Sequence, residues 1–196
     1  MGIHFPNDMW HAPTEEHYRL LRLARPEMVK TLLFTQCGFN QAAVHRRLRS
    51  EHPDALIVAR LFADMAGGPW PAGDFVREFV PIIEAALPYV DYFEIHNEPN
   101  LWLEWPSSTE RFGAWVDEVR RALARRFPTA RWCFPGQAVV AGFEGWWKAL
   151  LPLIARFDAW GVHCYWQYGN AGSPEWGRAY ELAHRPEMVD LPVQAV

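Results

Sequence analysis

The residues best placed to do chemistry in this chain lie in the tetrapeptide Asn97-Glu98-Pro99-Asn100. It follows the apolar segment 92–96, which is typical of a buried strand. Pro99 has no N–H group to donate to a sheet, so we expect the strand to end there and to present Glu98 at its C-terminal end. A carboxyl group so placed can act as a general acid or base. The alternative is an ordinary acid on a surface loop.

The side chains of the same strand predict a polar interior next to Glu98. Alternation along a strand places Glu94 and His96 on the same side as Glu98, pointing inward. A buried carboxylate needs a cationic partner or several hydrogen-bond donors. Arg60 and Lys30, on neighbouring predicted strands, are the candidates for pairing with Glu94.

Strands and helices alternate along the chain, with a repeat of about 25–30 residues that is typical of βα units. The expected strands are 28–34, 55–62, 92–96, 131–134, 159–165 and 191–196, with 2–5 as a weaker candidate for the first. The expected helices lie near 14–24, 40–50, 73–87, 109–126, 144–156 and 174–185. Ser107 and Glu110 form a predicted capping box at the start of the fourth helix.

The expected strands are near-continuous apolar runs that alternate with helices, which favours an α/β fold with parallel strands covered by helices. Either an open doubly wound sheet or a closed (β/α)8 barrel gives this pattern. No glycine-rich phosphate turn follows the first strand, which argues for the TIM-barrel type. A complete barrel usually needs about 200–250 residues or more. We therefore expect one domain, 1–196, with about seven strands and six helices, that stops within the seventh strand.

Composition excludes several classes of protein. Half of the 196 residues are apolar and the net charge is −4, so the chain can form a core and offers no basic surface for nucleic acid or an anionic membrane. No apolar run is long enough to cross a membrane. The three cysteines show no metal-binding or disulfide pattern, and no secretory signal is visible, so a cytoplasmic location is expected.

The segment Phe93-Glu94-Ile95-His96-Asn97-Glu98-Pro99-Asn100 resembles the fourth-strand signature of clan A retaining glycoside hydrolases, which are TIM barrels. It is most similar to the branch of β-xylosidases and α-iduronidases, with the cellulase-like branch next. The resemblance implies that Glu98 is the general acid/base and that Asn97 binds the 2-hydroxyl group of the sugar.

A second match lies on the sixth strand, where Asp158-Ala159-Trp160-Gly161-Val162-His163-Cys164-Tyr165-Trp166 is similar to the His-x-Tyr strand end of the clan. The resemblance implies that His163 lines the sugar subsite and that Tyr165 supports the nucleophile. It also implies that Arg60 is the arginine of the barrel mouth. Packed core residues are the alternative for His163 and Tyr165.

The chain contains eleven tryptophans, and six of them fall in predicted βα loops. These six are Trp10, Trp70, Trp102, Trp105, Trp166 and Trp176. Exposed aromatic residues at one end of a barrel can stack on sugar rings, so we expect Trp102, Trp105 and Trp166 to bind substrate. Core packing is the alternative, and it suits Trp115, Trp146, Trp147 and Trp160 best.

The clan's nucleophile lies at the end of the seventh strand, which places it just beyond Val196. A retaining mechanism needs two carboxyl groups, so we expect the chain by itself to be inactive by this route. Glu104, Asp64 and Glu175 are weaker candidates for a second carboxylate. A catalytically silent carbohydrate-binding barrel is the main alternative, and an aldolase or phosphosugar enzyme is a third. No cofactor or metal is expected, the partner is a carbohydrate, and the open barrel edge offers a route to self-association.

Overall fold

A computed structural model describes residues 2–5, 9–65, 67–101, 103–138, 143–161 and 194–195. The strands are β1 Gly2–His4, β2 Met28–Phe34, β3 Leu56–Phe62, β4 Tyr92–Ile95, β5 Trp132–Phe134, β6 Ala159–Trp160 and β7 Gln194–Ala195. The helices are α1 Glu15–Ala24, α2 Gln41–Glu51, α3 Ala72–Ala86, α4 Thr109–Arg126 and α5 Phe143–Ile154. The predicted helix 174–185 and most of the predicted strand 191–196 lie outside the described residues.

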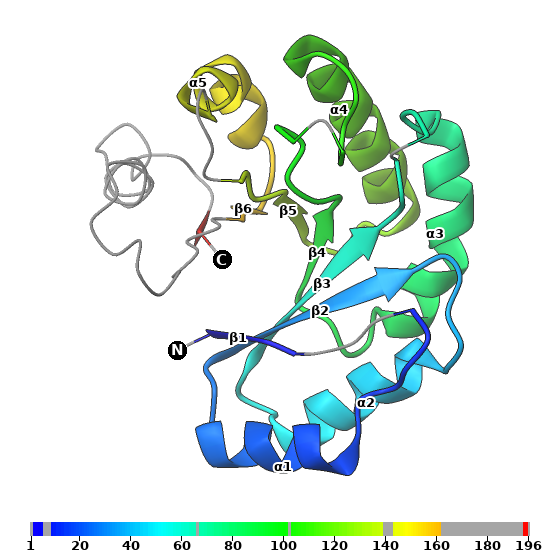
Figure 1. Ribbon diagram of the computed structural model, residues 1–196, viewed down its shortest axis with the longest axis vertical. Coiled ribbons are helices and arrows are strands. Elements are labelled where there is room, and N and C mark those ends of the chain that lie inside the picture. Colours follow the sequence, from blue (N-terminus) through cyan, green and yellow to red (C-terminus); the bar gives the residue numbers. More distant parts are fainter. Residues whose placement is uncertain are drawn as a thin grey trace.

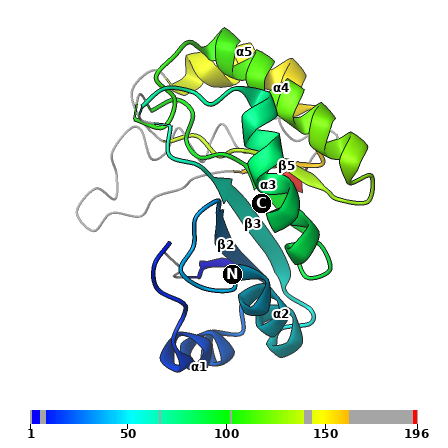
Figure 2. The ribbon, with the colours of Figure 1, turned by 90° about the vertical axis from the view of Figure 1, so that its right-hand side faces the viewer.

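The seven strands form one sheet in which every neighbouring pair is parallel and the spatial order follows the sequence, from β1 to β7. The sheet is curled and the helices lie on its outer side (Figure 1; Figure 2). A doubly wound sheet would reverse its strand order at a switch point, whereas a TIM barrel keeps sequence order throughout. The prediction of a TIM-barrel-type α/β fold is confirmed. None of the helices in the described ranges is both long and apolar enough for a membrane span.

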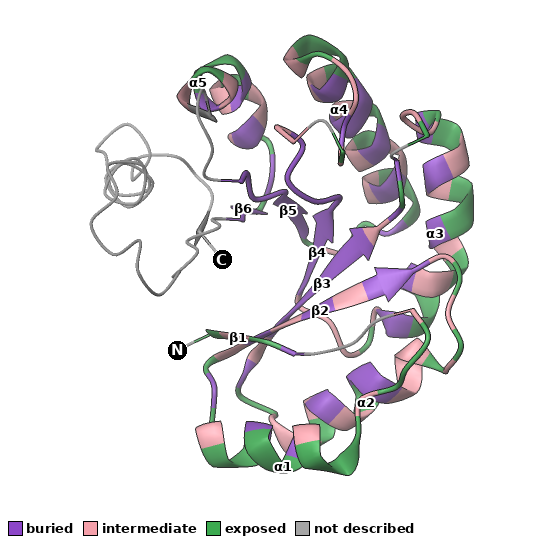
Figure 3. Ribbon diagram, viewed as in Figure 1, coloured by how far each residue is buried: buried purple, intermediate pink, exposed green. Residues whose placement is uncertain are grey.

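Alternation along β4 separates two apolar layers, one between the sheet and the helices and one inside the curl of the sheet. Phe93 and Ile95 belong to the large outer cluster, which also contains buried residues of α3 and α4. Tyr92 belongs to the small inner cluster with Val58 and Cys133. Strands β3 to β6 are almost entirely buried, β1 is largely exposed, and the helices are exposed on their outer faces (Figure 3). Glu94, which alternates with Phe93 and Ile95, therefore points inward.

The start of α4 differs by one residue from the prediction. Ser108, and not Ser107, is the N-cap residue, and its side chain accepts a hydrogen bond from the Arg111 N–H group. The Ser107 N–H group instead bonds to the Trp105 carbonyl oxygen at 2.8 Å. Ser107 thus belongs to the loop that leads from β4 to the helix, and this loop carries much of the candidate site.

Candidate active site at the end of strand β4

Strand β4 ends at Ile95, and the chain then turns sharply. His96 and Glu98 both adopt positive φ angles, +73° and +28°, in a region that residues other than glycine rarely visit. Each such residue costs about 1 kcal/mol or more, so the surrounding structure must hold it in place. The Leu101 N–H group bonds to the Glu98 carbonyl oxygen at 2.9 Å and closes the turn. Glu98 is therefore presented by a strained turn rather than by an extended strand.

His96 does not point inward as the alternation predicted, and this expectation is wrong because the strand has already ended. Its ring packs in the outer layer against Trp105, Phe112 and Trp115, with ring centroids 5.9–6.4 Å away. Burial lowers the pKa of His96 to about 4, so the ring is neutral near pH 7. Its Nε2 atom lies 2.9 Å from the Glu104 carbonyl oxygen and must carry the proton, because a carbonyl only accepts.

Glu94 has the cationic partners that the sequence predicted, and it has both of them. Its Oε2 atom lies 2.7 Å from Lys30 Nζ and 2.8 Å from Arg60 Nε, while Oε1 accepts a hydrogen bond of 3.0 Å from the Gly136 N–H group. The Glu94 side chain is fully buried. A Cβ atom at Gly161 would lie 2.6 Å from Glu94 Oε1, so β6 can approach this cluster only with glycine at that position. The cluster of Lys30, Glu94 and Arg60 forms the polar floor beneath the strand ends.

Glu98 and Asn97 lie above this floor and are nearly buried, with 7% and 9% of their surfaces exposed. Asn97 Nδ2 donates a hydrogen bond of 2.9 Å to Glu104 Oε1. Burial raises the pKa of the Glu104 carboxyl group; the bond from Asn97 works against this rise, and the negative charge of Glu98 adds to it. The end of β4 therefore brings two carboxyl groups within electrostatic reach of each other.

Gln137, which the sequence analysis missed, is a further candidate at the end of the next strand. It follows β5 and is buried, yet both polar atoms of its side-chain amide lack a hydrogen-bond partner among the described residues. The Asn100 side chain donates a hydrogen bond of 2.7 Å to the carbonyl oxygen of the adjoining Ala138 and accepts one of 2.8 Å from its N–H group. These bonds connect the loop after β5 to the loop after β4. Buried amides are normally satisfied, so an unsatisfied one marks a position where a ligand can bind. The position of Gln137 just after the end of a predicted strand could have indicated it from the sequence.

The expectation that Trp105 is an exposed stacking residue is wrong. Only 2% of its surface is exposed, and its ring packs against His96, Phe112 and Trp115 under the loop. The flanking proline suggested a surface position, but the loop folds its aromatic side chain into the outer core. Trp10, in contrast, is 64% exposed. Trp102, Trp166, Trp176, His163 and Tyr165 lie outside the described residues.

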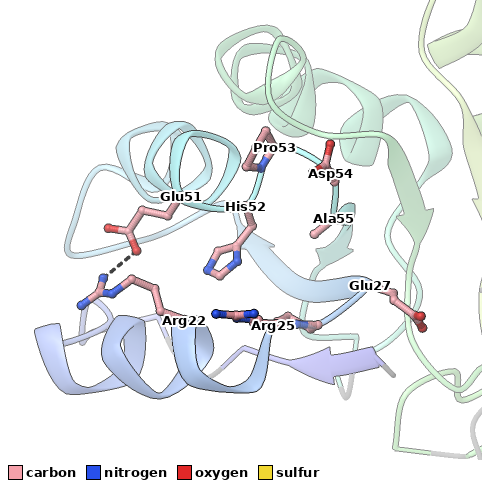
Figure 4. Close-up of a pocket in the computed structure, with 9 residues that line it drawn as sticks. Arg22, Arg25, Glu27, Glu51, His52, Pro53, Asp54 and Ala55 are labelled. Atoms are coloured by element: carbon pink, nitrogen blue, oxygen red, sulfur yellow. Dashed lines mark hydrogen bonds and ion pairs between the residues drawn. The ribbon is translucent and has the colours of Figure 1, made fainter.

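Trp70 lines a pocket of about 400 Å³ with Thr35, Gln36 and residues of the first turns of α3. Thr35 and Gln36 directly follow β2, so this pocket lies at the same end of the barrel as Glu98. A second pocket, of about 440 Å³, lies at the opposite end, where Glu27 and Ala55 precede β2 and β3. Arg22 and Glu51 form an ion pair across its side, and His52 points between them and Arg25 (Figure 4). Active sites of TIM barrels occupy the C-terminal end of the strands. The pocket beside Trp70 lies at that end, but neither Glu98 nor Asn97 lines it.

No protein-family model and no curated protein sequence matches this chain. Several solved structures do share its fold. A glucosidase from Croceicoccus marinus superposes with a TM-score of 0.62 at 16% identity, over 90% of this chain and 46% of that one. The catalytic domain of a mannanase from Streptomyces sp. SirexAA-E gives 0.58 at 14% identity, over 96% and 63%. A monomeric β-xylosidase from Caulobacter crescentus CB15 gives 0.52 at 16% identity, over 78% and 39%.

At this level of identity the comparisons show the fold, which is the TIM-barrel type. The chain spans less than half of the glucosidase and of the β-xylosidase, and 63% of the mannanase. All three proteins are named as glycosidases.

Proposed function

We propose that this chain belongs to a retaining O-glycosidase and that Glu98 is its general acid/base. The observation that carries the proposal is the placement of Glu98: a nearly buried carboxyl group, held by a strained turn at the C-terminal end of a TIM-barrel strand. This is the end of the barrel where such enzymes bind substrate. The glycosidase names of three proteins with the same fold support the proposal, as does the resemblance of the surrounding motif.

In the proposed reaction Glu98 first donates a proton to the oxygen atom of the departing group, and later takes a proton from the water that releases the sugar. The attacking carboxylate is expected about 5–5.5 Å from Glu98. Strand β7 pairs in parallel with β6, so residues that follow β7 emerge at the same barrel end as Glu98. We propose that the nucleophile is a glutamate in one of the two positions after Val196.

The floor of the site contributes to this chemistry through its charge. Lys30 and Arg60 carry two positive charges against the single negative charge of Glu94, which leaves a net charge of +1 among the three. A positive charge in a buried environment favours nearby carboxylates in their ionised form. It therefore supports an ionised nucleophile. The candidate sugar-binding groups among the described residues are Asn97 and Gln137.

The test is the replacement Glu98→Ala in the full-length protein that contains this sequence. Hydrolysis of natural glycosides should fall by about 100-fold or more, because the leaving oxygen needs a proton. Aryl glycosides with good leaving groups should lose far less in the bond-breaking step, since they need little protonation. Glu110→Ala, which removes an exposed carboxylate from α4, is the matched control and should change neither rate.

Equal losses on both kinds of substrate would contradict the acid role. Sequencing the gene beyond Val196 is an independent check. A glutamate in the next two positions agrees with the retaining mechanism, whereas glutamine, alanine or glycine there would exclude it and favour a carbohydrate-binding barrel without catalysis.

A further inference from the structure

Glu104 is joined to the end of β4 by two separate hydrogen bonds. Its main-chain carbonyl oxygen accepts from His96 Nε2 and its carboxyl group accepts from Asn97 Nδ2, each at 2.9 Å. The Glu104 N–H group also bonds to the Leu101 carbonyl oxygen at 3.0 Å. Two adjacent residues of the strained turn, His96 and Asn97, are therefore bonded to Glu104.

The chemistry of a carboxylate decides which way the Asn97 amide faces. An ionised carboxylate only accepts hydrogen bonds, so the group that faces Glu104 Oε1 must be the NH₂ group of the amide. The amide oxygen, Oδ1, then faces away from Glu104. It is buried and has no hydrogen-bond partner among the described residues. A buried acceptor without a donor is costly, and a donor supplied by a ligand would remove that cost.

We propose that Glu104 is a positioning residue that holds Asn97 so that its amide oxygen accepts a hydrogen bond from a hydroxyl group of the substrate. This inference rests on the proposed function; the resemblance already implies the contact of Asn97 with the sugar, and the new element is the role of Glu104. The sugar beside the cleaved bond must carry a free hydroxyl group that can donate at the position facing Asn97, which the motif assigns to carbon 2. A sugar with hydrogen or fluorine at that carbon cannot donate and should be discriminated against.

The experiment compares the full-length protein with Glu104→Ala, Asn97→Ala and the double variant. The substrates are a 4-nitrophenyl glycoside that the protein hydrolyses and its 2-deoxy analogue. On the parent glycoside, Glu104→Ala should lower kcat/KM by about 10- to 100-fold, the effect of leaving a buried polar group badly placed. On the 2-deoxy analogue the same change should have little effect, and in the Asn97→Ala background it should cause no further loss.

Two more variants separate positioning from folding. Glu104→Gln keeps an oxygen that can accept from Asn97, so kcat/KM should stay within about threefold of the unmodified protein. Glu104→Asp keeps the charge but is too short to reach Asn97, so it should repeat the selective loss even if Glu104→Ala fails to fold. Leu103→Ala, at a neighbouring loop residue that is 77% exposed, should behave like the unmodified protein.

Equal losses on the parent and 2-deoxy glycosides would overturn the inference, as would additive losses in the double variant. Failure of the proposed function has a different signature: hydrolysis would survive Glu98→Ala whatever Glu104 does. If Glu98→Ala abolishes hydrolysis of natural glycosides and the Glu104 and Asn97 effects remain additive, only the positioning role of Glu104 is wrong.

Discussion

Replacing Glu94 by glutamine should strongly destabilise the fold, because it removes the negative charge around which Lys30 and Arg60 are arranged. Both cations contact the same carboxylate oxygen, at 2.7 and 2.8 Å, and Glu94 is fully buried. A glutamine can offer its oxygen to the two cations, but its NH₂ group then faces the Gly136 N–H group, which is also a donor. The variant thus removes the negative charge that both cations contact and places two donors against each other.

The expected loss in the free energy of unfolding is about 3–5 kcal/mol, the cost of breaking a buried ion pair from one side. For a domain of this size that corresponds to a fall in Tm of roughly 6–20 °C. Urea unfolding followed by tryptophan fluorescence measures it, since the chain has eleven tryptophans. The loss caused by Glu94→Gln should change little with salt concentration, because salt screens buried ion pairs poorly.

The matched control is Glu84→Gln, which breaks the pair between Glu84 on α3 and Arg126 on α4. Its N–O distance is also 2.7 Å, but both side chains are largely exposed. This variant should lose about 1 kcal/mol or less. If Glu94→Gln costs no more than Glu84→Gln, the argument that the floor of the site is an electrostatically coupled cluster is refuted.

Three further predictions concern buried polar and aromatic side chains. Gln137→Leu should leave the free energy of unfolding unchanged or raise it, because it removes two unsatisfied buried atoms. It should also weaken the binding of an oligosaccharide, measured by calorimetry. A clear loss of stability would mean that Gln137 is hydrogen-bonded within the fold. Burial lowers the pKa values of His45 and His96 from 6.5 to about 4. As the pH drops from 6.5 to 4, the unfolded chain takes up protons that the folded chain cannot, so the free energy of unfolding should fall by up to about 3 kcal/mol for each ring. His96→Gln should reduce the pH dependence of the free energy of unfolding measured in urea. An unchanged pH dependence would argue against a lowered pKa of His96. Trp105→Ala should cost about 3–5 kcal/mol in urea unfolding, the usual cost of a buried large-to-small change, whereas a loss near zero would indicate a surface residue.

The elements of this fold could be predicted closely because parallel strands covered by helices are continuous apolar runs. The predicted strand 28–34 has the bounds of β2, and 55–62 is one residue longer than β3. The partners of Glu94 could be predicted for a related reason. A fully buried carboxylate requires a positive charge, and Lys30 and Arg60 lie on the two strands that precede β4 in the sheet.

The features that the sequence did not predict lie mainly in the turn and loop that follow β4. The direction of His96 reverses because its backbone adopts a positive φ, and no residue type in that segment signals such a conformation. Trp105 packs inward against Phe112 and Trp115 of α4, which are contacts that no local sequence pattern indicates. The bond between Asn97 and Glu104 spans seven residues of irregular chain and follows from the same loop. The sequence therefore located the acid/base candidate but not the residues that hold it.

The most direct test of the account is chemical rescue of Glu98→Ala by azide in the full-length protein, with an aryl glycoside as substrate. If Glu98 is the acid/base, the sugar–enzyme intermediate still forms, and azide replaces the water that Glu98 would have activated. The product should be a glycosyl azide with the same anomeric configuration as the substrate, and the rate should rise with azide concentration. A glycosyl azide of inverted configuration would make Glu98 the nucleophile instead. Undiminished hydrolysis without azide would show that Glu98 takes no part in the reaction.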